Sequence, residues 1–178
     1  MKIGLIADTH LFHRAVPLPR IVWDIFSGVD HIIHAGDITG QDVIPALERL
    51  APVTAVAGNL DSAAVRDRYG EKTVVHAGGF SIGVCHGHGE KGSTLDRAVG
   101  CFQDARVDCI VYGHSHIPYI GYHGGIWIVN PGSPTDKRRN RFFSVGMLDI
   151  DEGISPRLMY FDTGGAVVNT QCGAIPDA

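Results

Sequence analysis

The sequence predicts an α/β fold in which a parallel sheet covered by helices is joined to a second, largely antiparallel sheet. From Lys2 to Ala57, short apolar runs alternate with segments of helical periodicity in the order strand, helix, strand, helix, strand. That order implies parallel strands with helices packed on them. After Pro118, strand-like runs follow one another with few helical signals. Because we find no internal repeat and no linker, we expect one domain.

The first half of the chain should supply three buried strands and two helices. Apolar residues at helical spacing predict helices over Pro19–Phe26 and Gln41–Leu50, although Pro45 weakens the second prediction. Short apolar runs that stop at a polar residue or a glycine predict the strands. These runs are Lys2–Asp8, His31–Asp37 and Val53–Ala57.

The rest of the chain predicts a hairpin, a helix and further strands. Gly78-Gly79 separates two strand-like runs, which is a hairpin signal. Ser93–Ala105 is predicted to be a helix that begins with a relative of the capping box. Cys109–Gly113 is another buried strand. The residues after Asp162 show no clear periodicity, so we expect a domain over residues 1–162 and a loosely ordered tail over residues 163–178.

The composition describes an ordinary globular protein. Of the 178 residues, 44% are apolar and 19% charged, and the net charge of −4 gives no push toward nucleic acid or anionic membrane. The first apolar run is too short for a signal peptide or a membrane span. The four cysteines form no C-x-x-C pair, which favours reduced thiols. We therefore expect a cytoplasmic protein.

Metal-capable side chains follow five of the predicted strands. Each of these strands is followed by a carboxylate, an amide or an imidazole. Ligands of open α/β sheets bind at the carboxyl ends of the strands, so these side chains should meet at one edge. Seven such donors suit two divalent ions that share one carboxylate better than a single ion. The candidate ligands are Asp8, His10, Asp37, Asn59, His86, His114 and His116.

The local sequence offers reasons for this convergence. In extended backbone, the side chains of residues i and i+2 point the same way. Asp8 and His10 should therefore point to one place, and so should His114 and His116. Glycines precede three of the strand-end residues and allow sharp turns without a Cβ clash. One histidine at a strand end is most often structural, but five strand ends with ligand-capable groups are hard to assign to chance. The remaining strand histidines, His31, His34, His76 and His123, are interpreted as ordinary strand or loop residues.

These strand ends give the sequence a resemblance to the calcineurin-like metallophosphoesterases. The matching blocks come in the family's order and span most of the chain. They are Asp8-Thr9-His10, Gly36-Asp37, Gly58-Asn59-Leu60-Asp61, His86-Gly87-His88 and Gly113-His114-Ser115-His116. A further block, Asn130-Pro131-Gly132-Ser133, resembles a loop of the small single-domain phosphodiesterase branch.

The resemblance implies a four-layer α/β/β/α sandwich with two mixed β-sheets and a dinuclear metal site at the C-terminal edge of the strands. It implies hydrolysis of a phosphodiester, with a hydroxide between two ions as nucleophile. The N/O ligand set suits Mn²⁺, with Fe, Zn²⁺, Ni²⁺ and Co²⁺ as alternatives. By resemblance, the first ion is held by Asp8, His10, Asp37 and His116, and the second by Asp37, Asn59, His86 and His114, with Asp37 bridging.

Leu60 marks a departure from the wider superfamily, in which a histidine follows the asparagine of the third block. The small phosphodiesterase branch generally lacks this histidine, so Leu60 agrees with that branch. The general acid is then open: His88, His13, a metal-bound water and no acid at all remain alternatives. Asp61 should cap the turn or orient a ligand.

The residues that we expect to act on the substrate lie in three places. Asp37, Asn59 and His88 are the expected catalytic residues. Asn59 should also contact the substrate, together with the hydroxyl of Ser133. A short basic run follows the Ser133 loop and is either a solvated surface or supplies one arginine, Arg139, to grip a phosphate.

Other functions were weighed against this one. Gly87–Gly92 matches a dinucleotide fingerprint, but the next strand ends without the acidic residue that the fingerprint requires. A scaffold on the same fold, such as a retromer subunit, has lost key ligands, whereas all seven positions here are ligand-competent. A phosphomonoesterase stays open. The expected partner is a small phosphodiester or phosphomonoester, and the apolar strands of the second sheet would allow a homo-oligomer.

Overall fold

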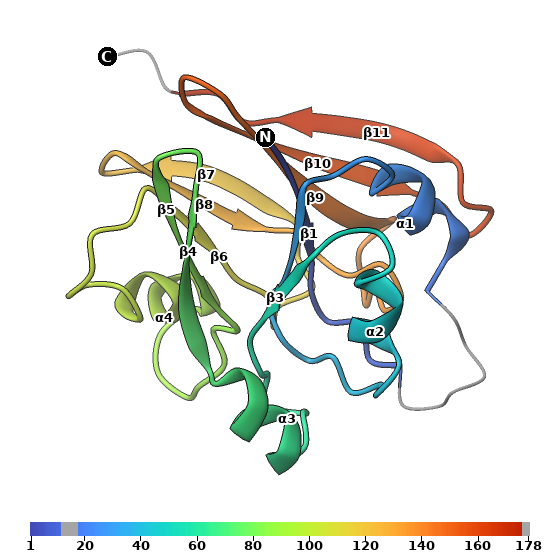
Figure 1. Cartoon of the computed structure of the whole chain (residues 1–178), viewed down its shortest axis with the longest axis horizontal. Coiled ribbons are helices and arrows are strands. Elements are labelled where there is room, and N and C mark those ends of the chain that lie inside the picture. The colour runs from blue at the N-terminus through green and yellow to red at the C-terminus, as the bar shows by residue number, and fades with distance from the viewer. Residues whose placement is uncertain (12–17, 176–178) are drawn as a thin grey trace.

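Two β-sheets packed against each other, with helices on their outer faces, form the body of the computed structural model (Figure 1). The structure describes residues 1–11 and 18–175. None of the helices in these two ranges has the length and apolar composition needed to cross a bilayer.

The first sheet has six strands, in the order β11-β10-β9-β1-β2-β3. The three strands β1, β2 and β3 run parallel, as the alternation of strands and helices predicted, and β9 pairs antiparallel with β1. Their bounds are β1 Lys2–Ile6, β2 His31–His34, β3 Val53–Ala55, β9 Phe143–Ile150, β10 Ile154–Phe161 and β11 Val167–Cys172.

The second sheet has five strands, in the order β4-β5-β6-β8-β7. The hairpin prediction is confirmed, because Ala77 pairs with Phe80 across Gly78 and Gly79, which both have positive φ. Strands β5, β6 and β8 run parallel, and the outer strands β4 and β7 run antiparallel to their neighbours. The bounds are β4 Lys72–Ala77, β5 Phe80–Cys85, β6 Cys109–Val111, β7 Tyr119–His123 and β8 Ile126–Asn130.

The helices are short. Pro45 lies in the first turn of its helix, where its missing N–H has no intrahelical partner to lose. The capping box at Ser93 is confirmed, because its hydroxyl accepts from the Asp96 N–H and the Asp96 carboxylate accepts in return. The helix over Ala63–Tyr69 was not predicted, although the Ser62 side chain caps its N-terminus by accepting the Val65 N–H. The bounds are α1 Arg20–Ile25, α2 Val43–Leu47, α3 Ala63–Tyr69 and α4 Thr94–Gly100.

Three hydrophobic clusters fill the interfaces between four layers. Leu5 and Val84 belong to the cluster between the two sheets. Val22 of α1 and Leu47 of α2 pack against the first sheet, and Ala98 of α4 packs in the cluster on the second sheet. The layer order is therefore α/β/β/α, with two mixed sheets, as the family resemblance implied.

The strands after Pro118 do not form a sheet of their own, contrary to the sequence prediction. Strands β7 and β8 complete the second sheet, whereas β9, β10 and β11 extend the first sheet beyond β1. The expected loose tail also differs, because Val167–Cys172 pairs with β10 as an edge strand. Period-2 alternation shows that a segment is extended, but it does not say which strand far along the chain will pair with it.

The carboxyl ends of five strands from both sheets meet at one edge of the sandwich. The Asp8 N–H donates to the Gly36 carbonyl at 3.0 Å, which joins the loops after β1 and β2. The Gly113 N–H donates to the His86 carbonyl at 3.2 Å, which joins the loops after β6 and β5. The His114 N–H donates to Asp8 Oδ1 at 3.1 Å and connects the two sheets.

Candidate metal centre

Two clusters of ligand-capable side chains lie at this edge. Within each cluster the ligand atoms are within 4.8 Å of one another. Asp37 reaches toward both, since its Oδ2 lies 3.3 Å from His86 Nε2 and 3.7 Å from His10 Nε2. This position suits a carboxylate shared between two ions. The clusters are Asp8, His10 and His116, and Asp37, His86 and His114.

The first cluster has two imidazoles turned toward each other. The Nε2 atoms of His10 and His116 are 3.0 Å apart, and their rings stack with centroids 4.9 Å apart. His116 Nδ1 lies 2.6 Å from the Asp136 carbonyl oxygen, so the ring donates there. Its Nε2 therefore keeps a lone pair that can bind a metal ion. Metal-binding histidines are usually oriented in this way, by a hydrogen bond from their other ring nitrogen.

The second cluster contains a histidine whose inner nitrogen lacks a hydrogen bond. His86 is buried, and its Nδ1 donates to the Ala35 carbonyl oxygen at 2.8 Å. Among the described residues, no group hydrogen-bonds to His86 Nε2 or to the buried Asp8 Oδ2. Burying such atoms without a partner is costly. A divalent cation would satisfy both atoms, so the residues present fit a metal centre.

Five of the seven expected ligand residues adopt left-handed backbone rather than extended backbone. The φ angles are 53° at Asp8, 45° at His10, 54° at Asp37, 65° at His114 and 58° at His116. Such conformations cost about 1–3 kcal/mol for a non-glycine residue and occur mainly where surrounding structure holds them for function. The expectation of extended backbone was therefore wrong. Asp8 and His10 do reach one cluster, as expected, whereas His114 and His116 belong to different clusters.

The glycines at the strand ends are required for close packing. A Cβ at Gly58 would overlap Asp37 Oδ1, and a Cβ at Gly113 would come within 3.0 Å of Asp8 Oδ2. Gly36 combines both demands, with φ 94° and a Cβ that would lie 2.6 Å from the His86 ring. The expectation that glycine avoids a Cβ clash is therefore confirmed at all three positions, and positive φ is an additional requirement at Gly36 alone of these three.

Backbone amides hold the loops around the carboxylates. The Leu60 N–H donates to Asp37 Oδ1 at 2.8 Å. Asp61 is buried and accepts the N–H groups of Ile38, Thr39 and Gly58 at 3.2, 2.7 and 2.8 Å. Asp61 therefore fixes the Asp37 loop relative to Gly58, which is the orienting role that the sequence suggested for it.

A buried histidine outside both clusters ties two of the ligand loops together. His34 Nδ1 accepts the Gly36 N–H at 3.2 Å, and its Nε2 lies 3.1 Å from Thr9 Oγ1. The Thr9 hydroxyl donates to the Ile38 carbonyl at 3.0 Å, so His34 donates to Thr9 in its neutral form. Burial lowers the pKa of His34 to about 3. Its interpretation as a structural strand residue agrees with these contacts.

The site separates the acidities of its two carboxyl groups. Burial raises the pKa of Asp8 to about 7, against the opposing attraction of His86. Burial acts in the same direction on Asp37, but the interaction with His86 and the Leu60 N–H outweigh it and lower the Asp37 pKa to about 2. Burial also lowers the pKa of His114 to about 4. Asp37 is thus the carboxylate that stays ionised throughout the neutral range.

The expected residues around the second cluster lie near it but are more exposed. Asn59 is exposed and directly follows Gly58, which packs against Asp37. The His88 ring lies 5.6 Å from the His86 ring, and burial, with the nearby charge of His86, lowers the pKa of His88. That direction disfavours the protonated form a general acid needs. The alternative acid, His13, lies outside the described residues.

The structure gives Ser133 and Arg139 different places from those expected. Ser133 is buried, its hydroxyl donates to the Asp8 carbonyl at 2.8 Å and accepts the Asp136 N–H, and it therefore serves the loop rather than a substrate. Arg139 is exposed. Its neighbour Arg138 is the arginine beside the metal centre, with Nη2 3.5 Å from His116 Nε2.

The sequence gives no local signal that separates Arg138 from Arg139. The difference comes from the backbone of the loop, where Arg138 has φ 48° and its guanidinium Nε lies 2.8 Å from Asp136 Oδ2. Because the Asp136 carbonyl also accepts from His116, the loop places Arg138 at the first cluster.

Comparisons with known proteins agree with this geometry. Residues 1–153 match the calcineurin-like phosphoesterase superfamily domain. A protein of Methanocaldococcus jannaschii named "probable metallophosphoesterase" is 41% identical over 162 residues, which cover 89% of this chain and 81% of that protein. A solved Zn²⁺ complex of Vps29 from Entamoeba histolytica has a TM-score of 0.76 at 24% identity, with 97% of each chain covered.

A second solved structure, described as a novel archaeal phosphodiesterase, has a TM-score of 0.70 at 26% identity. It covers 90% of this chain and 100% of its own. The fold, the two ligand clusters and the sequence match all point the same way. This chain belongs to the calcineurin-like phosphoesterase superfamily.

Proposed function

We propose that this protein is a metal-dependent phosphodiesterase that works with two divalent ions. The observation that carries the proposal is the pair of ligand clusters with Asp37 reaching toward both. Family membership supports phosphoester chemistry, and the likeness to an archaeal phosphodiesterase favours diesters.

The residues that would hold the ions follow from the clusters. The first ion would bind Asp8, His10, Asp37 and His116, and the second Asp37, Asn59, His86 and His114. When bound, two such ions supply an activated water and neutralise charge on the phosphate oxygens. The mixed N/O donors suit Mn²⁺, with Fe, Zn²⁺, Ni²⁺ and Co²⁺ as alternatives. Zn²⁺ stays among these alternatives because the solved Vps29 structure from Entamoeba histolytica contains it.

The protein's own groups would orient the phosphate from two sides. Arg138 stands at the first cluster, and Asp136 fixes its guanidinium at 2.8 Å. A planar guanidinium of this kind binds two phosphate oxygens at once. Asn59 and His88 stand near the second cluster, where Asn59 would contact the phosphate and His88 would hydrogen-bond the leaving oxygen.

A scaffold function is the second candidate, because several structural neighbours are Vps29 proteins. The buried unpartnered atoms of Asp8 and His86 favour the metal-dependent activity over a scaffold. A phosphomonoesterase would use the same clusters, and the two activities differ only in the substrate that is turned over.

The test pairs metal analysis with substrate assays. Purified protein is analysed for bound metals and assayed with bis-p-nitrophenyl phosphate and p-nitrophenyl phosphate. We expect metal-dependent turnover with the diester preferred, and a loss of at least about 100-fold in Asp37→Asn and His86→Ala. His76→Ala, which changes an exposed histidine of the β4–β5 hairpin, is the matched control. Folded, metal-loaded protein that turns over neither substrate would overturn the proposal.

A further inference from the structure

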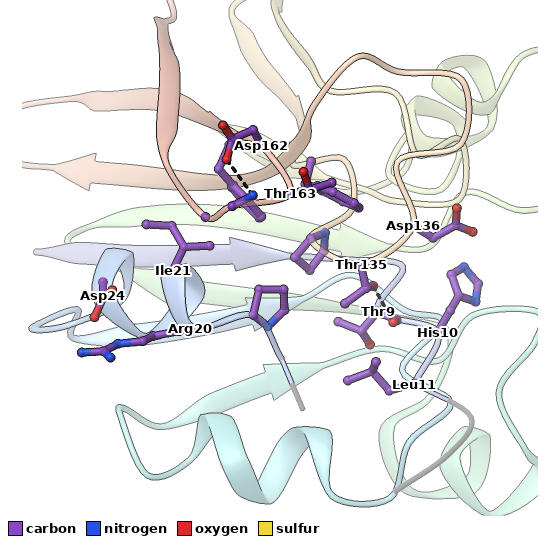
Figure 2. Close-up of a pocket in the computed structure, with 16 residues that line it drawn as sticks. Thr9, His10, Leu11, Arg20, Ile21, Asp24, Thr135, Asp136, Asp162 and Thr163 are labelled. Atoms are coloured by element: carbon purple, nitrogen blue, oxygen red, sulfur yellow. Dashed lines mark hydrogen bonds between the residues drawn. The ribbon is translucent and has the colours of Figure 1, made fainter. Parts of the chain in front are cut away.

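A pocket of about 970 Å³ opens beside His10. Its walls come from the loop after β1, the start of α1, the loop after Ser133, the start of β9 and the β10–β11 turn. Figure 2 shows His10 and Asp136 at one end, and Arg20 with Asp24 at the other. Its volume is at the upper end of the range for small-molecule sites.

The pocket is continuous with the first metal-ligand cluster. His10 belongs to that cluster and also lines the pocket. Asp136 lines the pocket as well, and its backbone carbonyl accepts the hydrogen bond from His116. A phosphate held at the cluster would therefore present one of its ester substituents to the mouth of the pocket.

The side walls of the pocket are mainly apolar. Leu11, Ile21 and Phe143 are half-buried and face the pocket. The Phe143 ring stacks on the buried Phe161, with centroids 5.8 Å apart, so that wall is rigid. The hydroxyl of Thr135 donates to the Thr9 carbonyl at 2.6 Å and is not free to bind a polar ligand. If an apolar group occupied the pocket, few polar atoms of these walls would be left without a hydrogen-bond partner.

The charges of the pocket oppose an anionic ligand. Among the described residues that line it, Asp24, Asp136 and Asp162 stand against one cation, Arg20. Asp136 is paired with Arg138, whose Nε lies 2.8 Å from its Oδ2. The remaining two carboxylates outnumber Arg20, so the described part of the lining offers no basic surface for a second phosphate.

We propose that this pocket is the subsite for the second ester substituent of a phosphodiester and that it takes a bulky, uncharged organic group of aryl or nucleoside size. The inference rests on the proposed function and deepens it by naming the substrate class. Phosphomonoesters lack the substituent that would fill the pocket. Diesters whose second substituent is small or anionic gain little from it.

The first test compares p-nitrophenyl phosphodiesters that share one leaving group. The second substituent is methyl, phenyl or p-carboxyphenyl, and each hydrolysis breaks the P–O bond to p-nitrophenolate and leaves the corresponding monoester. We expect kcat/KM to be at least about tenfold higher for phenyl than for methyl. The anionic p-carboxyphenyl diester should lose most of that gain. Equal rates for phenyl and methyl, or a preference for p-carboxyphenyl, would overturn the inference.

Filling the pocket tests whether the preference arises there. Ile21→Trp and Thr163→Trp each place an indole against the pocket, one from α1 and the other from the β10–β11 turn. We expect both to remove the phenyl preference by lowering kcat/KM much more for the phenyl diester than for the methyl diester. Val168→Trp adds the same group on exposed β11, outside the pocket, and should keep the preference. Thr163 is exposed, so its variant should fold even where Ile21→Trp does not.

A binding measurement separates this inference from the proposed function. Phenylphosphonate and methylphosphonate are titrated into metal-loaded protein by calorimetry. We expect phenylphosphonate to bind at least about tenfold more tightly, and Thr163→Trp to abolish the difference. Selective binding without turnover of any diester would sink the proposed activity and keep the pocket. Turnover of diesters with no discrimination between the two phosphonates would support the proposed activity and overturn the inference about the pocket.

Discussion

Gly58 packs directly against the carboxylate of Asp37, so closely that a Cβ on Gly58 would overlap Asp37 Oδ1. The same contact places Asn59 next to the shared carboxylate, because Asn59 follows Gly58 in the chain. The close packing of these two loops thus sets the position of Asp37, the candidate ligand that lies between the two clusters.

Gly58→Ala should therefore displace Asp37 and weaken metal binding. We expect at least about a tenfold loss in metal affinity and in kcat/KM, because small displacements of a positioned group are costly. Isothermal titration with Mn²⁺ and a diester assay measure the two effects. Gly153→Ala is the matched control, because nothing lies within 4 Å of a Cβ at that position. An unchanged affinity in Gly58→Ala would show that the Asp37 loop can yield without loss.

Asp61→Asn should destabilise the protein, because Asp61 accepts three backbone N–H groups and an amide cannot accept all of them. We expect a loss of about 1–3 kcal/mol in the free energy of unfolding, measured in urea with metal removed. Asp67→Asn changes an exposed carboxylate on α3 and should have little effect. Equal stability of both variants would show that Asp61 does not hold these loops.

Stability should fall with acid partly because His34 is buried in its neutral form. The pKa of His34 is lowered to about 3, so the unfolded chain binds a proton below about pH 6.5 that the folded chain does not. Its contribution is complete above that pH and falls by at most about 1.4 kcal/mol for each pH unit down to pH 3.

His34→Gln keeps one acceptor and one donor without the titration. Urea unfolding at pH 7 and pH 5 should therefore show a smaller loss of stability for this variant than for the unchanged protein. Parallel losses in the two proteins would contradict the assignment to His34.

Metal removal should lower the melting temperature. Asp8 Oδ2 and His86 Nε2 are buried without hydrogen-bond partners among the described residues, and a bound cation stabilises only the folded chain. At a hundred times the dissociation constant the gain is about 2.7 kcal/mol. A chelator should lower the melting temperature of the unchanged protein and have a much smaller effect on Asp8→Asn. A protein that melts alike with and without a chelator would argue against a bound metal.

Arg138→Ala should impair substrate binding, whereas Arg139→Ala should not. Both arginines are exposed, but Arg138 Nη2 lies 3.5 Å from His116 Nε2 and Arg138 Nε is paired with Asp136. We expect KM for a diester to rise by at least about tenfold in Arg138→Ala and to change less than about twofold in Arg139→Ala. Arg138→Lys, which keeps the charge without the guanidinium fork, should fall between them. The reverse order would restore Arg139 as the phosphate ligand.

Much of the candidate site follows from local sequence. All six of the expected ligands that are aspartates or histidines fall into the two clusters, because each lies shortly after a strand whose apolar pattern is plain in the sequence. The side chains that were misplaced depend on loop geometry. Ser133 and Arg138 lie in one loop, whose course is set by hydrogen bonds to Asp8 and His116 from distant parts of the chain.

The sequence by itself determined which chemical groups stand at the strand ends, in which order, and therefore that candidate metal ligands gather at one edge of the sheets. Only the tertiary structure decided that β9 joins β1, that five of the seven expected ligand residues adopt positive φ, and that Arg138 rather than Arg139 contacts the first cluster. The physical reason is the separation along the chain between the residues that determine each feature. Apolar periodicity is a local property of a few residues, whereas strand pairing and the backbone of a packed loop are fixed by partners far along the chain.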